Sequence, residues 1–101
     1  LRALPAVADF FCEMDVRMHY SGLGDGMRFP MPLMQSDVGE IAGLSKVHIS
    51  RVMKDLRDAQ LCTHRNGVVE ILDRCALRKL AGYDPGYLFL PEGQDPPRDG
   101  Y

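Results

Sequence analysis

The chain has 101 residues with a net charge of −2, a size that suits one domain with a modest core. Hydrophobic residues make up 46% of the sequence and charged residues 26%, an ordinary composition for a globular protein. No apolar run approaches the roughly 20 residues needed to cross a bilayer, and no signal peptide is recognisable. We therefore expect a cytoplasmic protein without a membrane contact. Since residue 1 is Leu1 rather than methionine, we expect a fragment of a longer protein.

The first predicted element is a helix over residues 5–20. Its apolar residues recur at steps of three and four and make one stripe, Val7, Phe10, Phe11, Met14 and Met18. Glycines then predict a loop over residues 22–26. Pro30 and Pro32 cannot donate to a strand ladder, so any strand over residues 29–33 is expected to be short and at an edge.

Two further helices are predicted, one over residues 35–42 with Val38, Ile41 and Ala42 inward, the other from Lys46 to Ala59. Ser45 suits the N-cap of the second helix. The link between the helices is only Gly43-Leu44-Ser45. Such a short link with a glycine favours a sharp angle between the helices, as in a helix-turn-helix.

The predicted helix from Lys46 to Ala59 has two distinct faces. Ile49, Val52, Met53 and Leu56 follow the spacing of a core face, and Val47, Ser50, Arg51 and Lys54 follow the same spacing on another side. The stretch from Ser45 to Gly67 holds five basic and two acidic residues, a local charge of +3. The rest of the chain must then sum to −5, so the positive charge is gathered in one stretch.

A β-hairpin is predicted next, because two β-prone runs, 61–65 and 68–72, flank Asn66-Gly67. Asp73 suits the N-cap of a short helix that reaches Ala81, with Leu77 and Leu80 inward. We assign residues 1–90 to the folded domain. The tail 91–101 is rich in proline, glycine and charge, and we expect it to be disordered.

This order of elements predicts a mainly α fold with a small β-hairpin wing, a winged helix-turn-helix built on a three-helix bundle. In that geometry the second motif helix lies in the major groove of DNA and the wing lies on the backbone. An arginine at its start can bond two acceptors of guanine, worth about 1–3 kcal/mol of discrimination. The sequence therefore predicts a DNA-binding domain without catalysis, cofactor or metal.

The segment from Leu33 to Leu56 resembles the helix-turn-helix of Crp/Fnr transcription regulators, which include the cyclic-AMP receptor protein. The shared pattern is Gln-x-Asp/Glu-Ile/Val-Gly/Ala, then Gly-x-Ser, then Arg-Val/Ile-Leu/Met-Lys/Arg-x-Leu. The run from Asp73 to Leu88 is similar to the end of one branch of that family. The likeness covers about residues 5–90.

The resemblance implies that the complete regulator is a bacterial homodimer that reads a two-fold operator and contacts RNA polymerase. It also implies an N-terminal effector-sensing barrel, for a cyclic nucleotide or another effector, which is absent from this chain. By position, the base-reading residues would be Lys46, Val47, Ser50 and Arg51. The phosphate contacts we expect are Gln35, Ser45, His48, Lys54, His64 and Arg65.

Two positions depart from the family pattern. Many members carry an acidic residue where this chain has Val47, which leaves the operator sequence open. A hydroxyl residue is common at the position of Met34, so the cap of the first motif helix is expected to be weaker or shifted to Ser36.

Three further sequence features bear on other functions. The glycines of residues 22–26 lack the spacing of a dinucleotide fingerprint. Cys12, Cys62 and Cys75 match neither a zinc site nor a disulfide framework, and we expect reduced, mostly buried thiols. The main alternative is a winged helix that contacts protein instead of DNA, which the overall acidic charge permits.

Overall fold

The computed structural model describes residues 3–82. The amphipathic start of the chain forms α1 (Ala3–Tyr20), which leads through a loop to the short strand β1 (Arg28–Pro30). The helix-turn-helix pair follows as α2 (Gln35–Ala42) and α3 (Lys46–Asp58). The strands β2 (Cys62–Arg65) and β3 (Val68–Ile71) form the hairpin, and α4 (Arg74–Ala81) ends the described part. The predicted fold class is confirmed, with boundaries of the helices and of the hairpin strands that differ by two residues at most.

The sheet is three-stranded and antiparallel, in the order β1-β3-β2. In the hairpin, His64 pairs with Val69 and Arg65 with Val68, on either side of the predicted turn. Asn66 and Gly67 both have positive φ, 51° and 72°, as the predicted two-residue turn requires. The predicted edge strand is confirmed as β1, where Phe29 faces Val69 of β3.

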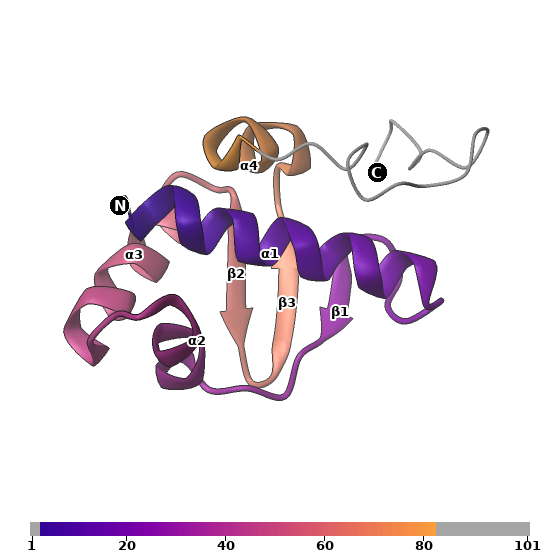
Figure 1. The fold of residues 1–101 in the computed structure, drawn as a ribbon. Coiled ribbons are helices and arrows are strands. Elements are labelled where there is room, and N and C mark those ends of the chain that lie inside the picture. Colours follow the sequence, from indigo (N-terminus) through magenta and orange to yellow (C-terminus); the bar gives the residue numbers. More distant parts are fainter. Residues whose placement is uncertain (1–2, 83–101) are drawn as a thin grey trace.

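One continuous core joins the helices to the sheet. In Figure 1, α1 crosses one face of the sheet, while α2 and α3 lie on the side of β2. The fully buried side chains come from all these elements and include Phe11 of α1, Ile49 and Leu56 of α3, and Val69 and Ile71 of β3. The hairpin is therefore anchored in the same core as the helix-turn-helix, and the position of its turn is set relative to α3.

The inward face of α1 differs from the predicted stripe. Val7 and Phe11 are buried as expected, but Phe10, Met14 and Met18 are only partly buried. Ala8, Cys12 and Val16 are buried in their place, and so is the carboxylate of Asp15. The smaller side chains of α1 face inward because α4 packs closely against this helix. Arg74 of α4 also supplies a partner for Asp15.

The prediction for Ile41 is wrong, since its side chain is 60% exposed. The buried residues of α2 are Val38 and Gly39, with Ala42 partly buried. Position 39 packs directly on α3, so the inward stripe runs through residues 38, 39 and 42, and Ile41 points the other way. The side of α2 that meets α3 was decided by a close approach to Ile49 that periodicity does not encode.

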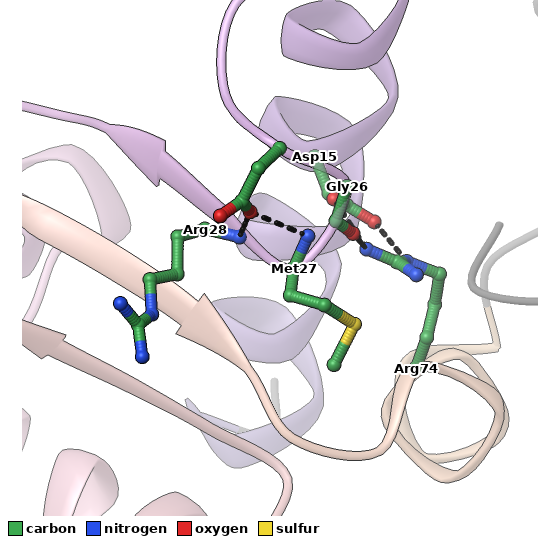
Figure 2. Close-up of polar contacts among 6 residues, drawn as sticks. Asp15, Gly26, Met27, Arg28 and Arg74 are labelled. Atoms are coloured by element: carbon green, nitrogen blue, oxygen red, sulfur yellow. Dashed lines mark hydrogen bonds and ion pairs between the residues drawn. The ribbon is translucent and has the colours of Figure 1, made fainter.

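Polar contacts connect the loop after α1 with α1 and with α4. Asp25 accepts hydrogen bonds from the backbone N–H groups of Met27 and Arg28, at 3.0 and 2.7 Å. These two bonds lower the pKa of the Asp25 carboxyl below its usual value. Figure 2 shows the neighbouring contact, in which Arg74 at the start of α4 reaches Asp15 and the carbonyl of Gly26.

The predicted domain boundary at residue 90 and the predicted tail 91–101 lie outside the described residues. Within residues 3–82, no helix is both long and apolar enough to cross a membrane.

Candidate nucleic-acid interface

The turn between α2 and α3 is closed by backbone hydrogen bonds and one side-chain cap. Gly43 has a φ of 74° and donates its N–H to the carbonyl of Glu40, and Leu44 donates to the carbonyl of Gly39 at 2.7 Å. This pair of bonds is the αL helix ending that glycine favours. The Ser45 side chain then accepts a hydrogen bond from the N–H of His48 at 3.2 Å, so the predicted N-cap is confirmed.

The contact between Gly39 and Ile49 holds α2 against α3. A Cβ atom at position 39 would lie only 2.9 Å from Cγ2 of Ile49 and 3.2 Å from the carbonyl oxygen of Leu44. A side chain there would have to push the helices apart, since such distances are well inside van der Waals contact. The angle at which α3 leaves the turn therefore depends on the absence of a side chain at position 39.

The sequence left two alternatives for the cap of α2, a weaker cap at Met34 or a cap shifted to Ser36. The helix begins at Gln35, so Met34 is the N-cap and Ser36 lies inside the first turn. The predicted shift to Ser36 is wrong, whereas the predicted weakness is right, because the Met34 side chain makes no capping hydrogen bond. Asp37 compensates in part: it accepts a hydrogen bond from the N–H of Met34 at 2.8 Å.

The two predicted faces of α3 are both present. Ile49, Val52, Met53 and Leu56 are buried, which confirms the core face. The side chains predicted to read bases are all exposed, namely Lys46, Val47, Ser50 and Arg51. Val47 is 75% exposed, whereas the other aliphatic residues of α3 are buried.

An ion pair occupies the far end of the exposed face of α3. The Lys54 ammonium lies 2.5 Å from Oδ2 of Asp58, one helical turn further along. The hydrogen bond from Lys54 lowers the pKa of the Asp58 carboxyl, which therefore stays ionised at neutral pH. Lys54 is thus exposed and near the predicted base-reading residues, but the carboxylate of Asp58 partly neutralises its positive charge.

Five of the six predicted phosphate contacts are exposed, and they lie on α2, on α3, at the cap of α3 and on the hairpin. They are Gln35, Ser45, His48, Lys54 and Arg65. His48 and Arg51 also line a shallow hollow beside the start of α1, formed with Leu4 and Pro5. Both residues therefore lie on the flank of α3 that faces α1.

His64 is placed differently from the expectation. Its Nε2 atom lies 3.2 Å from the carbonyl oxygen of Met31, and its ring meets Phe11 edge-on, with ring centroids 6.1 Å apart. The side chain is partly buried against α1 rather than directed outward from the hairpin turn. This packing gives His64 a structural part in holding the hairpin.

Arg57 is a basic residue that the sequence reasoning counted in the local charge but did not assign to the interface. Its side chain is 45% exposed, and its Nε lies 4.0 Å from Oδ1 of Asp58. Arg57 stands seven positions after Ser50, so two helical turns bring it back to nearly the same side of α3. The seven-residue spacing from Ser50 is therefore the sequence signal that places Arg57 near the predicted interface.

The described residues offer no place for a metal ion: no group of three or more His, Cys, Asp or Glu lies close enough within residues 3–82. Cys12 and Cys62 are buried and Cys75 is exposed, and all three are free thiols. Burial raises the pKa of Cys12 and of Cys62 to about 12. The arrangement instead presents a basic, partly apolar helix face between a helix N-terminus and a hairpin.

A tightly linked helix pair, a third helix beneath it and an anchored hairpin define the fold as a winged helix-turn-helix. Residues 6–80 match the family model described as the Crp-like helix-turn-helix domain. The chain belongs to this family of DNA-binding regulators, which confirms the family that the sequence resembles.

Solved structures of the regulator CprK share the fold. Reduced CprK without any ligand has 21% sequence identity over 79% of this chain, with a TM-score of 0.66. CprK complexed with OCPA has 23% identity over 80% of the chain, and oxidised CprK with o-chlorophenolacetic acid 22% over 88%, both with TM-scores of 0.66. This chain covers 38% of the length of each CprK chain. No curated protein sequence matches it.

Proposed function

We propose that this chain binds double-stranded DNA sequence-specifically, as the output domain of a transcription regulator. The observation that carries the proposal is the exposed face of α3, which begins at the first residue of the helix and carries Lys46, Val47, Ser50 and Arg51. These side chains point away from the core face. The N-terminal residues of a recognition helix are the ones that contact base edges in the major groove.

The side chains on this face suit particular base edges. The Arg51 guanidinium can donate two hydrogen bonds to O6 and N7 of one guanine. Val47 offers only methyl groups, which suit the C5-methyl of thymine rather than a hydrogen-bonding edge. Lys46 and Ser50 can donate hydrogen bonds at the two ends of the first helical turn. Arg51 therefore carries most of the proposed discrimination.

The backbone contacts are proposed for exposed side chains around α3. Lys54 and Arg65 bring positive charge, and Gln35 brings an amide to the first turn of α2. Ser45 already accepts the cap hydrogen bond from His48, but its hydroxyl hydrogen can still be donated to a phosphate oxygen. His48 and His64 complete the proposed set, and the partly buried ring of His64 makes it the weaker of these two candidates.

The complete regulator is proposed to act in the cytoplasm as a homodimer on a two-fold operator, with RNA polymerase as a further partner. An effector such as a cyclic nucleotide would act through a part of the protein outside this chain, and this domain would need no cofactor. A single domain lacks the high effective concentration that a linked second half-site supplies. We therefore expect the chain alone to bind DNA weakly.

The test is fluorescence anisotropy of a labelled random-sequence duplex, with the chain titrated at low salt and again as salt is raised. Circular dichroism under the same conditions establishes that the protein is folded. Binding that weakens steeply with salt supports the proposal, because phosphate contacts release counterions. Absence of binding by folded protein at low salt would refute it and favour a winged helix that contacts protein.

A further inference from the structure

A small hollow lies where three elements of the proposed interface meet. Gln35 of α2, Met53 and Arg57 of α3, and Thr63, His64 and Arg65 of β2 line it. The buried Met53 is the apolar member, and the other five side chains carry polar atoms. The hollow thus brings together Gln35 from the start of α2, Arg57 from the second half of α3 and Arg65 from one strand of the hairpin.

The hollow is electropositive. Arg57 and Arg65 contribute two guanidinium groups, and none of the residues that line the hollow is acidic. The acidic contact of Arg57 is Asp58, at 4.0 Å, and that carboxylate already pairs with Lys54 at 2.5 Å. Two arginines converge at one opening, while the neighbouring acid is held to another cation. This arrangement favours an anion with several oxygen acceptors.

The dimensions of the hollow limit what can enter it. Its volume is about 20 Å³, which is room for one atom the size of a water oxygen. A whole phosphate group is too large to be enclosed. One phosphate oxygen can enter, while the rest of the group stays at the mouth between the two arginines.

We infer that Arg57 and Arg65 bind one and the same backbone phosphate of DNA, with an oxygen of that phosphate in the hollow and the amide of Gln35 beside it. The inference rests on the proposed function and adds Arg57 as a binding residue on the flank of α3. It also joins Gln35 and Arg65, which were proposed as separate contacts, in one site. The site couples the recognition helix to the hairpin, so the two dock on DNA in a fixed relative position.

The number of phosphates that a protein neutralises can be counted from the salt dependence of DNA binding. The logarithm of the binding constant falls with the logarithm of salt concentration, with a slope of about −0.9 for each phosphate contact. Arg57→Gln, Arg65→Gln and the double variant are compared with the unchanged chain on a random-sequence duplex. Arg17→Gln, an exposed arginine on α1, is the matched control.

A shared phosphate predicts that each single variant binds the duplex more weakly at fixed low salt than Arg17→Gln does, because one charge-assisted contact is lost. The slope should lose no more than about 0.9 even in the double variant, because the slope counts phosphates and only one is released. Arg57→Lys should keep most of the affinity, because it keeps the positive charge. An affinity of Arg57→Gln equal to that of Arg17→Gln would overturn the inference. So would a slope loss of about 1.8 in the double variant, which means two separate phosphates.

These outcomes separate the site from the proposed function. Steep, salt-dependent binding by the unchanged chain with no effect of Arg57→Gln refutes only the shared site. No binding by the unchanged, folded chain refutes the proposed function and the shared site together. Arg57 and Arg65 are exposed at the surface, so we expect the variants to keep the melting temperature of the unchanged chain.

Discussion

The carboxylate of Asp15 and the guanidinium of Arg74 form a buried, bidentate ion pair between helices α1 and α4. Nε of Arg74 lies 2.7 Å from Oδ2 of Asp15, and Nη2 lies 3.2 Å from Oδ1, across 59 positions of sequence. Nη2 also donates to the carbonyl of Gly26 in the loop after α1 (Figure 2). Asp15 is 4% and Arg74 8% exposed, so both charges depend on each other and on the loop.

We predict that Arg74→Met lowers the free energy of unfolding by about 3–5 kcal/mol, because it leaves the Asp15 carboxylate buried without its cation. This is a large share of the 5–15 kcal/mol that a small domain typically has. Urea denaturation followed by circular dichroism measures the change. The double variant Asp15→Leu/Arg74→Met should recover much of the loss, because it removes both charges. A single-variant loss below about 1 kcal/mol would contradict the buried pair.

Arg51→Ala should reduce discrimination between the operator and random DNA by about 1–3 kcal/mol, which is about 5- to 150-fold in relative affinity. The reason is that a bidentate contact to one guanine is lost, while most phosphate contacts remain. Anisotropy titrations of the variant on both duplexes measure the two affinities once an operator has been selected from a random library. An equal loss of affinity on the two duplexes would exclude base reading by Arg51.

Asp58→Asn should strengthen binding to random DNA at low salt. The substitution removes a negative charge from the exposed side of α3 and releases Lys54 from its 2.5 Å ion pair, so that the ammonium can meet a phosphate. Glu13→Gln removes an equivalent pair with Arg17, at 2.8 Å on α1, and serves as the control without an expected effect. Weaker binding by Asp58→Asn than by the unchanged chain would show that the pair positions Lys54 instead of restraining it.

At neutral pH only Cys75 should react quickly with a thiol reagent such as 5,5′-dithiobis(2-nitrobenzoate). Cys12 and Cys62 are buried with pKa values raised to about 12, so they are almost entirely protonated, and the thiolate is the reactive form. One thiol should titrate in the folded protein and three in urea. Fast reaction of a second thiol without denaturant would contradict the burial of Cys12 and Cys62.

The same pKa values predict lower stability in alkali. A thiol whose folded-state pKa is raised binds its proton more tightly in the folded than in the unfolded chain, where the pKa is about 9. Its contribution is therefore complete below pH 9 and is lost as pH rises toward 12, at up to ~1.4 kcal/mol per pH unit for each thiol. Cys62→Ala should show a smaller alkaline loss than the unchanged chain, and Cys75→Ala the same loss.

Features that depend on neighbouring residues could be predicted from the sequence. Ser45 caps α3 because its side chain reaches the N–H of His48, three positions along. Asn66-Gly67 closes the hairpin because both residues accept positive φ. The core face of α3 follows from helical spacing alone. The outer face, with Val47 and Arg51, is its geometric complement and was predicted for the same reason.

Other features depend on contacts between distant parts of the chain, and only the tertiary structure decided them. Ile41 is exposed because the close approach of Gly39 to Ile49 determines which side of α2 faces inward. His64 turns toward Phe11 because α1 crosses one face of the sheet (Figure 1).

The meeting of Asp15 with Arg74, and of Arg57 with Arg65, likewise joins residues on different elements. Local spacing determines which side of a helix a residue occupies, since the backbone geometry repeats. It does not determine what lies opposite that side. The partners are set by the way all the elements pack into one core, because burial favours the arrangement that satisfies every element together.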